Sequence, residues 1–294
     1  RAPPSMCGIF AAFSLDGRGL AADADARARR ALHAIRPDVV HVHASIVSTG
    51  ALAGAWAADR LGLPIVVTFH SVLGRWRYLL RAVDLVATAG VPVLGVNLGG
   101  LGFLTAISAG HFAKELRAVW QGKFTIETRP LIEVGGSLGG QLVSRPALND
   151  FVVSRGAGSR LIELEVTVDG EELTRYRCDG LIVSSPTGST AYSLAAGGAI
   201  VSPRAEVFTL TPICPHTLSN RSVVVSLHST IGIRALSGRI ETLLSADGEV
   251  VAPMAAGESV VIRRSERSTR LLHSAGTSFF KTLRQKLNWS GAHV

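Results

Sequence analysis

The sequence predicts an α/β N-terminal domain followed by an all-β second domain and a final helix. Two observations support this prediction. Helical and strand patterns alternate through the first 120 residues, which is typical of βαβ units around a parallel sheet. After residue 120 the strand-like runs are short and are separated by turn residues. We therefore expect an α/β domain over residues 1–120 and a β-rich domain over residues 121–276.

The N-terminal domain is predicted from seven segments. Helical patterns cover residues 21–35, 50–61, 79–87 and 113–120, and strand patterns cover residues 39–43, 65–70 and 91–97.

The second domain is predicted from eight strand-like runs, at residues 124–134, 141–154, 161–168, 173–177, 181–184, 223–227, 231–235 and 260–263. Asp169 and Gly170 lie between two of these runs, and both residue types tolerate a positive φ, which predicts a β-hairpin. Residues 279–287 form an amphipathic helical pattern.

Composition indicates a folded chain. Of its 294 residues, 47% are hydrophobic and 18% are charged, which suffices for a buried core. No apolar run approaches the ~18 residues of a membrane helix, so we expect no membrane partner. Three cysteines without metal-ligand spacing, and no signal-peptide core, favour reduced thiols in the cytoplasm and no metal-ligating residues.

The formal net charge of +8 suits a polyanionic ligand. Charge alone does not separate nucleic acid from nucleotide. Because aromatic residues do not interleave with the basic clusters, no stacking platform for single strands is present and we expect no nucleic-acid partner.

Two polar segments interrupt apolar strand patterns. A glycine-rich loop follows the strand at residues 91–97, where an open α/β sheet binds ligands, and it can be a phosphate loop or a tight structural turn. Its residues are Gly95, Asn97, Gly99, Gly100 and Gly102. Asn149 and Asp150 sit inside a β run that disfavours them, so they mark either ribose-binding groups or a turn or bulge.

Residues 178–192 hold the densest cluster of hydroxyl groups. An apolar strand leads into Pro-Thr-Gly-Ser-Thr, and a turn of this kind can present N–H and hydroxyl groups to an anion or a ribose. A helix cap explains one or two hydroxyls but not all four, which are Thr187, Ser189, Thr190 and Tyr192. Asp247 and Gly248 are most simply a hairpin turn.

Taken in order, these segments resemble the NAD kinase family from about residue 81 to residue 294. The resemblance implies transfer of the γ-phosphate of ATP, or of polyphosphate, to the 2′-hydroxyl of the adenosine ribose of NAD, assisted by Mg²⁺ or a similar ion. It also implies a homodimer or homotetramer, and a C-terminal helix at residues 277–294 that closes the first domain.

The resemblance further implies roles for individual residues. Asn149 and Asp150 are expected on the NAD riboses, and Asp179 near the nicotinamide end, where a neighbouring subunit can supply it. The residues expected around the adenosine and its phosphates are Thr187, Ser189, Thr190, Ala191 and Tyr192. Asp247 is expected to be the main acidic group near the phosphates, and therefore the candidate catalytic residue.

The chain departs from the family at one motif. The family carries Gly-Gly-Asp-Gly upstream of the glycine loop, whereas this chain has Leu-Gly-Arg-Trp-Arg-Tyr at residues 73–78. Arginine binds phosphate but cannot act as a base, so a non-catalytic NAD-binding homologue is the first alternative. The N-terminal 70 residues instead resemble the acceptor-side domain of nucleotide-sugar glycosyltransferases. This suggests a mosaic joined at residues 79–84, with a glycosyltransferase-type fragment as a further alternative.

Overall fold

The computed structural model divides the chain into two compact units, Arg1–Leu79 and Leu80–Val294. It describes residues 40–44, 65–69, 92–97, 103–104, 107–108, 111–158, 160–216, 221–236, 238, 240–274, 276 and 278–289. Within these ranges, no helix is long and apolar enough to cross a membrane.

The first unit contains two described strands, β1 (Val40–Ala44) and β2 (Ile65–Phe69), which pair in parallel. Both were expected from the sequence, at residues 39–43 and 65–70. The helices predicted at residues 21–35, 50–61 and 79–87 lie outside the described residues.

The second unit begins with short elements, β3 (Pro92–Leu94), β4 (Val96–Asn97), β5 (Ile107–Ser108) and helix α4 (Phe112–Trp120). β4 and β5 pair in parallel, and β3 pairs in parallel with a different strand, the long β17 (Ser259–Ser274). The strand predicted at residues 91–97 is therefore divided, and its first part extends the large sheet of the second unit.

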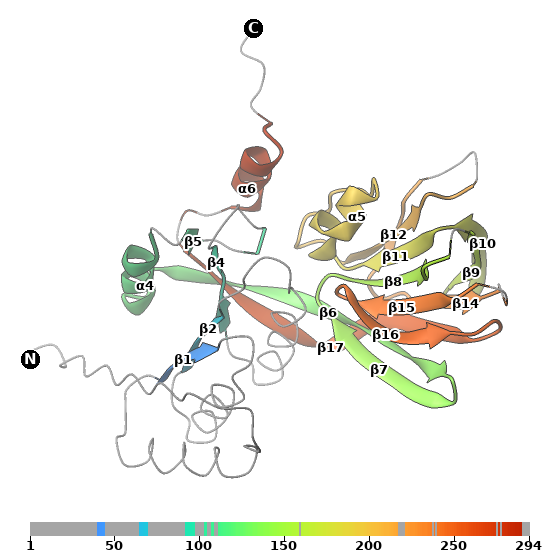
Figure 1. Ribbon diagram of the computed structural model, residues 1–294. Helices are drawn as coiled ribbons and strands as arrows, with labels where there is room; N and C mark the ends of the chain where they lie inside the picture. The colour runs from blue at the N-terminus through green and yellow to red at the C-terminus, as the bar shows by residue number, and fades with distance from the viewer. Residues whose placement is uncertain are drawn as a thin grey trace, which may run out of the picture. The chain divides into compact units, whose positions relative to one another are not determined.

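Two sheets of mainly antiparallel strands make up most of the second unit (Figure 1). The larger follows the order β10-β9-β14-β17-β6-β7, with β3 beside β17. Its other strands are β6 (Phe124–Leu138), β7 (Gln141–Ala147), β9 (Ile162–Val168), β10 (Glu171–Cys178) and β14 (Ile231–Ala235). The smaller sheet follows the order β13-β12-β11-β8-β15-β16. Its strands are β8 (Asp150–Arg155), β11 (Gly180–Ser184), β12 (Val207–Ile213), β13 (Val223–Ser226), β15 (Thr242–Ala246) and β16 (Glu249–Met254).

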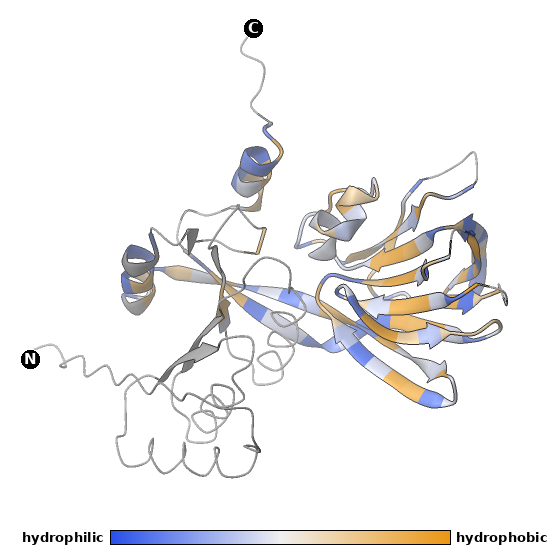
Figure 2. Cartoon of the chain, viewed as in Figure 1, coloured by the Kyte–Doolittle hydropathy of each residue, from blue (hydrophilic) through white to orange (hydrophobic). Residues whose placement is uncertain are grey.

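One hydrophobic core draws on both sheets, and Figure 2 shows the apolar residues concentrated on their strands. Because side chains alternate along a strand, β8 contributes Phe151 and Val153 to the core. The same alternation turns Asp150 to the opposite face of the sheet, where it pairs in register with Ser184 of β11. Ser184 pairs in turn with Thr209 of β12. The three side chains form a buried polar row across one end of the smaller sheet.

Some strands differ from the predicted ones. The single run predicted over residues 141–154 is two strands, β7 and β8, with a turn at Leu148 and Asn149. β12 is not among the predicted strands, because Thr209, Thr211 and Pro212 interrupt its apolar pattern. Its threonines are nevertheless buried on the polar face of the sheet. The predicted Asp169-Gly170 hairpin is confirmed, with φ of 52° and 85° joining β9 to β10.

The C-terminal helix α6 (Phe279–Lys286) begins at Ser278, whose hydroxyl accepts a hydrogen bond from the backbone N–H of Lys281 at 3.2 Å. The ring of Phe279 lies 6.2 Å from that of Phe103, and the Lys286 ammonium lies 4.5 Å from the Phe103 ring centre. The helix thus packs on the segment that follows the glycine loop.

Candidate functional site

The structure brings two predicted NAD-binding segments together at one end of the smaller sheet. Asn149 precedes β8 and residues 185–190 follow β11, and these two strands are antiparallel neighbours. The backbone N–H of Ser185 donates to the carbonyl of Asn149 at 2.8 Å. The Ser185 hydroxyl donates to the carbonyl of Leu148 at 2.5 Å. These bonds hold the two segments against each other.

Glycine is required where the segments meet. A Cβ on Gly188 would lie 2.0 Å from the carbonyl oxygen of Asn149, far inside van der Waals contact. Only a residue without a side chain allows this approach of two backbones. The glycine of the Pro-Thr-Gly-Ser-Thr motif therefore has a packing role in addition to any role toward a ligand.

The carboxylate of Asp247 orders the turn that carries Asn149. Asp247 and Gly248 join β15 to β16 with φ of 49° and 79°, which confirms the predicted hairpin turn. One Asp247 oxygen accepts the N–H of Leu148 at 2.8 Å, and the other accepts those of Asn149 at 2.7 Å and Asp150 at 3.2 Å. Both oxygens of the predicted catalytic residue are thus engaged with the backbone.

Asp150 is a buried carboxylate beside this anchor. Its side chain is 4% exposed. Burial, together with the negative charge of Asp247, raises the pKa of Asp150 to about 7. Burial also raises the pKa of Asp247, although the three backbone N–H groups oppose that effect. Two carboxyl groups with raised pKa values at the mouth of a turn are typical of a functional site.

The hydroxyls of the 187–192 segment have divided roles. The Ser189 hydroxyl donates to the carbonyl of Pro186 at 2.8 Å and accepts the N–H of Val201 at 3.1 Å. Thr190 donates to the carbonyl of Thr187 at 3.2 Å. These contacts make the turn rigid. Tyr192, in contrast, is 47% exposed.

The helical part of this segment is short. It consists of a 3₁₀ turn, η2 (Gly188–Thr190), and a helix of four residues, α5 (Tyr192–Ala195), with Ala191 between them. A helix this short has little dipole to offer an anion, so the rigid turn itself is the feature that a ligand would meet.

Asp179 lies away from this cluster. It precedes β11, whose opposite end carries Ser184, so five residues or about 17 Å separate Asp179 from that end. Its carboxylate accepts a hydrogen bond from Arg155 Nε at 2.6 Å. Asp179 and the Asn149 turn therefore lie at opposite ends of β11.

The glycine loop is described only in part. Gly95 is partly buried between β3 and β4, and Asn97 ends β4, opposite Ser108 of β5. Gly99, Gly100 and Gly102 lie outside the described residues, as do residues 73–78.

Two contacts at the site involve residues that the sequence analysis did not select. Ser185 bridges the two segments, and Arg129 of β6 donates to the Thr187 hydroxyl at 3.4 Å. Arg129 lies two residues before buried Leu131, so the two side chains are on the same face of β6. An arginine on a face that otherwise points to the core could have marked this position in the sequence. Nothing in the sequence around Ser185 distinguishes it as a site residue in a similar way.

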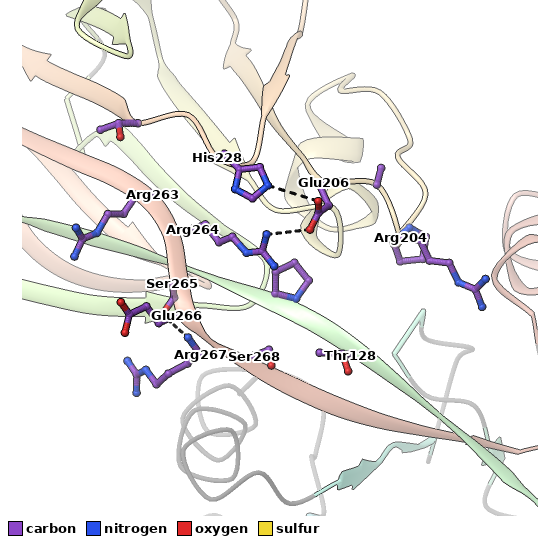
Figure 3. A pocket seen from close by; sticks show the side chains of 14 residues that line it. Thr128, Arg204, Glu206, His228, Arg263, Arg264, Ser265, Glu266, Arg267 and Ser268 are labelled. Atoms are coloured by element: carbon purple, nitrogen blue, oxygen red, sulfur yellow. Dashed lines mark hydrogen bonds and ion pairs between the residues drawn. The ribbon is translucent and has the colours of Figure 1, made fainter.

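A pocket of about 740 Å³ lies elsewhere on the second unit, between β17, β6 and the loops before β12 and β14 (Figure 3). Its arginines are accompanied by acids: Arg264 and His228 both contact Glu206, at 2.9 and 3.5 Å. None of the predicted NAD-binding residues lines this pocket.

Comparisons with known families follow the same division of the chain. Residues 148–274 match the ATP-NAD kinase C-terminal domain, and residues 79–124 match the ATP-NAD kinase N-terminal domain. Residues 8–89 match Glycosyltransferase Family 4. The two kinds of match meet at residues 79–89, in agreement with the mosaic junction predicted at residues 79–84 and with the boundary between the units.

Individual proteins extend this likeness. The NAD kinase of Symbiobacterium thermophilum is 44% identical over 243 residues, covering 79% of this chain and 86% of the relative. The NAD kinase of Geotalea daltonii is 41% identical over 236 residues, covering 80% of this chain and 83% of the relative. Yeast NADH kinase, solved with NADH, shares the fold with a TM-score of 0.68 at 24% identity, covering 92% of this chain and 85% of its own. The NAD kinase of Archaeoglobus fulgidus, solved with ATP, gives a TM-score of 0.61 at 25% identity, covering 85% of this chain and 98% of its own.

Replacing Gly188 by alanine should destabilise the site. The new methyl group would meet the Asn149 carbonyl, and overpacking of this kind typically costs about 1–3 kcal/mol. The matched control is Gly135→Ala on β6, where a Cβ meets nothing within 4 Å. Thermal unfolding should show a lower midpoint for Gly188→Ala only, and equal midpoints would refute the close packing.

Stability should depend on the ionisation of Asp150. Its folded-state pKa is raised from 3.8 to about 7, so its protonated form favours the folded state. That contribution to the free energy of unfolding is complete below about pH 4, declines as the pH rises, and is lost above about pH 7. Its full size is on the order of 4 kcal/mol. Unfolding midpoints of the wild type should therefore fall more steeply between pH 4 and pH 7 than those of Asp150→Asn. Parallel pH profiles would show that Asp150 does not titrate in this way.

Proposed function

The chain belongs to the NAD kinase family, and we propose from this premise that it transfers the γ-phosphate of ATP to the 2′-hydroxyl of the adenosine ribose of NAD⁺. The observation that carries the proposal is the contact between the Asn149 turn and residues 185–190. These are the segments on which the family resemblance predicts the NAD riboses and adenosine. Identities of 41–44% to NAD kinases over most of the chain support the same activity.

The binding roles in this proposal follow the predicted residues. Asn149 and Asp150 bind the ribose hydroxyls, and Tyr192, exposed beside the rigid turn, offers its ring to the adenine. The engaged hydroxyls of Ser189 and Thr190 keep that turn in shape for the ligand. Preorganisation of this kind reduces the entropy that binding costs.

The proposed reaction balances with one proton acceptor. The 2′-oxygen forms a bond to the γ-phosphorus of ATP, the bond from that phosphorus to the bridging oxygen breaks, and ADP leaves. The 2′-hydroxyl proton needs a base, and we propose Asp150. A pKa of about 7 is close to the operating pH, where general-base catalysis is most effective.

Asp247 is proposed to act on the site through the turn it holds. The sequence predicts it as the main acidic group near the phosphates. The three backbone N–H groups that its oxygens accept favour a positioning role instead. Mg²⁺ is proposed to enter with ATP, because it commonly binds phosphates together with one or two carboxylates.

The proposal includes a homodimer or homotetramer. Asp179 lies five residues before Ser184, about 17 Å along β11 from the end of the sheet that carries the Asn149 turn. A neighbouring protomer can supply it, as the resemblance implies. The α/β arrangement predicted for the N-terminal domain is likewise proposed, and the parallel pairs β1–β2 and β4–β5 support it.

Catalysis should be slow. Residues 73–78 replace the family's Gly-Gly-Asp-Gly with two arginines and two large aromatic residues. Loss of one positioned acid–base group typically lowers a rate by ~10²–10⁴-fold. A coupled assay for NADP⁺ with NAD⁺, ATP and Mg²⁺ should therefore give turnover well below the usual kinase range of roughly 1–100 s⁻¹. Ordinary rates would overturn this expectation, and NAD⁺ binding without any NADP⁺ would establish the non-catalytic alternative.

Asp247→Asn should weaken both NAD⁺ binding and turnover. The asparagine amide has one acceptor oxygen, and its NH₂ group would face backbone N–H donors, so some of the three hydrogen bonds to the turn are lost. Each lost hydrogen bond to a charged group costs about 1.5–3 kcal/mol. The control is Asp169→Asn, a matching hairpin aspartate at the β9–β10 turn. Loss of turnover at unchanged NAD⁺ affinity would instead assign Asp247 to the phosphates alone.

A further inference from the structure

A partly buried cluster of charged and ionisable side chains connects the two long strands β6 and β17 to the proposed NAD site. Arg129 is 4% exposed, and its Nη2 lies 3.0 Å from a carboxylate oxygen of Glu127. His273 of β17 places its Nε2 3.2 Å from the same oxygen. This second contact lies within ion-pair distance, but His273 Nε2 makes no hydrogen bond to a described residue.

Glu127 and Arg129 keep their charges. The His273 imidazole, and next to it the Arg129 guanidinium, lower the pKa of Glu127 to about 2 against the opposing effect of burial. Burial lowers the pKa of Arg129, and Glu127 opposes that change. A buried ion pair is often no more stable than a hydrophobic substitute, so stability alone is a weak reason for charges here.

The free edge of the guanidinium reaches the proposed site. Arg129 Nη1 donates to the Thr187 hydroxyl at 3.4 Å, although the two residues are 58 positions apart. Arg129 Nε is buried and has no hydrogen-bond partner among the described residues. Thr187 is itself 5% exposed and opens the turn formed by residues 187–190. One planar guanidinium thus spans Glu127 and the turn.

We propose that Arg129 is a positioning residue that sets the conformation of the Thr187 turn for NAD⁺. His273 contacts Glu127, Glu127 holds the guanidinium in place, and the guanidinium holds Thr187. This inference rests on the proposed function for its ligand. Its conformational part, that Arg129 orders residues 185–191, does not depend on the ligand.

The test compares Arg129→Met with the matched variant Arg263→Met. Arg263 makes an ion pair with Glu133 across the same two strands at 2.8 Å, but it is exposed and far along β17 from residue 273. Hydrogen exchange of the unliganded protein should show faster exchange at residues 185–191 in Arg129→Met and wild-type exchange in Arg263→Met. NAD⁺ affinity by calorimetry should fall about tenfold in Arg129→Met only, as expected for a lost charge-assisted hydrogen bond.

Two further variants separate positioning from general stabilisation. Arg129→Lys keeps the charge beside Glu127 but cannot span both partners, so it should fold and still bind NAD⁺ more weakly. Thr187→Val removes the hydroxyl, and combining it with Arg129→Met should weaken binding no more than the larger single change. Additive losses, wild-type binding by Arg129→Lys, or unchanged exchange at residues 185–191 would each overturn the inference. If the wild type binds no NAD⁺, the proposed function fails, and the exchange experiment still decides the role of Arg129.

Discussion

The site depends on one charged group accepting three backbone hydrogen bonds. The Asp247 carboxylate pairs with the N–H groups of residues 148–150, which the turn would otherwise leave unsatisfied at the edge of a buried core. With that turn fixed, the carbonyl of Asn149 meets the N–H of Ser185 and the backbone of Gly188. The ends of β8, β11 and β15 are thereby joined, and the proposed contacts to NAD⁺ from Asn149, Asp150 and residues 187–192 are arranged around them.

This arrangement places two carboxyl groups where ionisation is costly. Asp150 and Asp247 are close enough that the charge of one raises the pKa of the other. The backbone N–H groups compensate Asp247, whereas no such bond contributes to the pKa of Asp150. The two residues therefore have different proposed roles. Asp247 anchors the turn through its backbone hydrogen bonds, and Asp150 exchanges a proton. Proteins tolerate such local cost mainly at functional sites.

The sequence alone predicted much of this site, but not how its parts connect. Both Asp-Gly hairpins were predictable because the two residues share the left-handed backbone that such turns need. Strand alternation predicts which face Asp150 occupies, yet it does not reveal that its backbone N–H donates to the carboxylate of Asp247, 97 positions away. The contact from Arg129 to Thr187 is equally non-local. β12 was missed because its buried polar face conceals the hydrophobic period.

The central claim is that the turn at Asn149 and Asp150 binds NAD⁺ in a chain whose family machinery is incomplete at residues 73–78. Calorimetric titration of NAD⁺ into the wild type and into the double variant Asn149→Ala, Asp150→Ala tests it most directly. Each lost hydrogen bond to a ribose is worth roughly 1–3 kcal/mol, so the account predicts binding by the wild type and at least about tenfold weaker binding by the variant. Wild-type affinity in a folded double variant would contradict it.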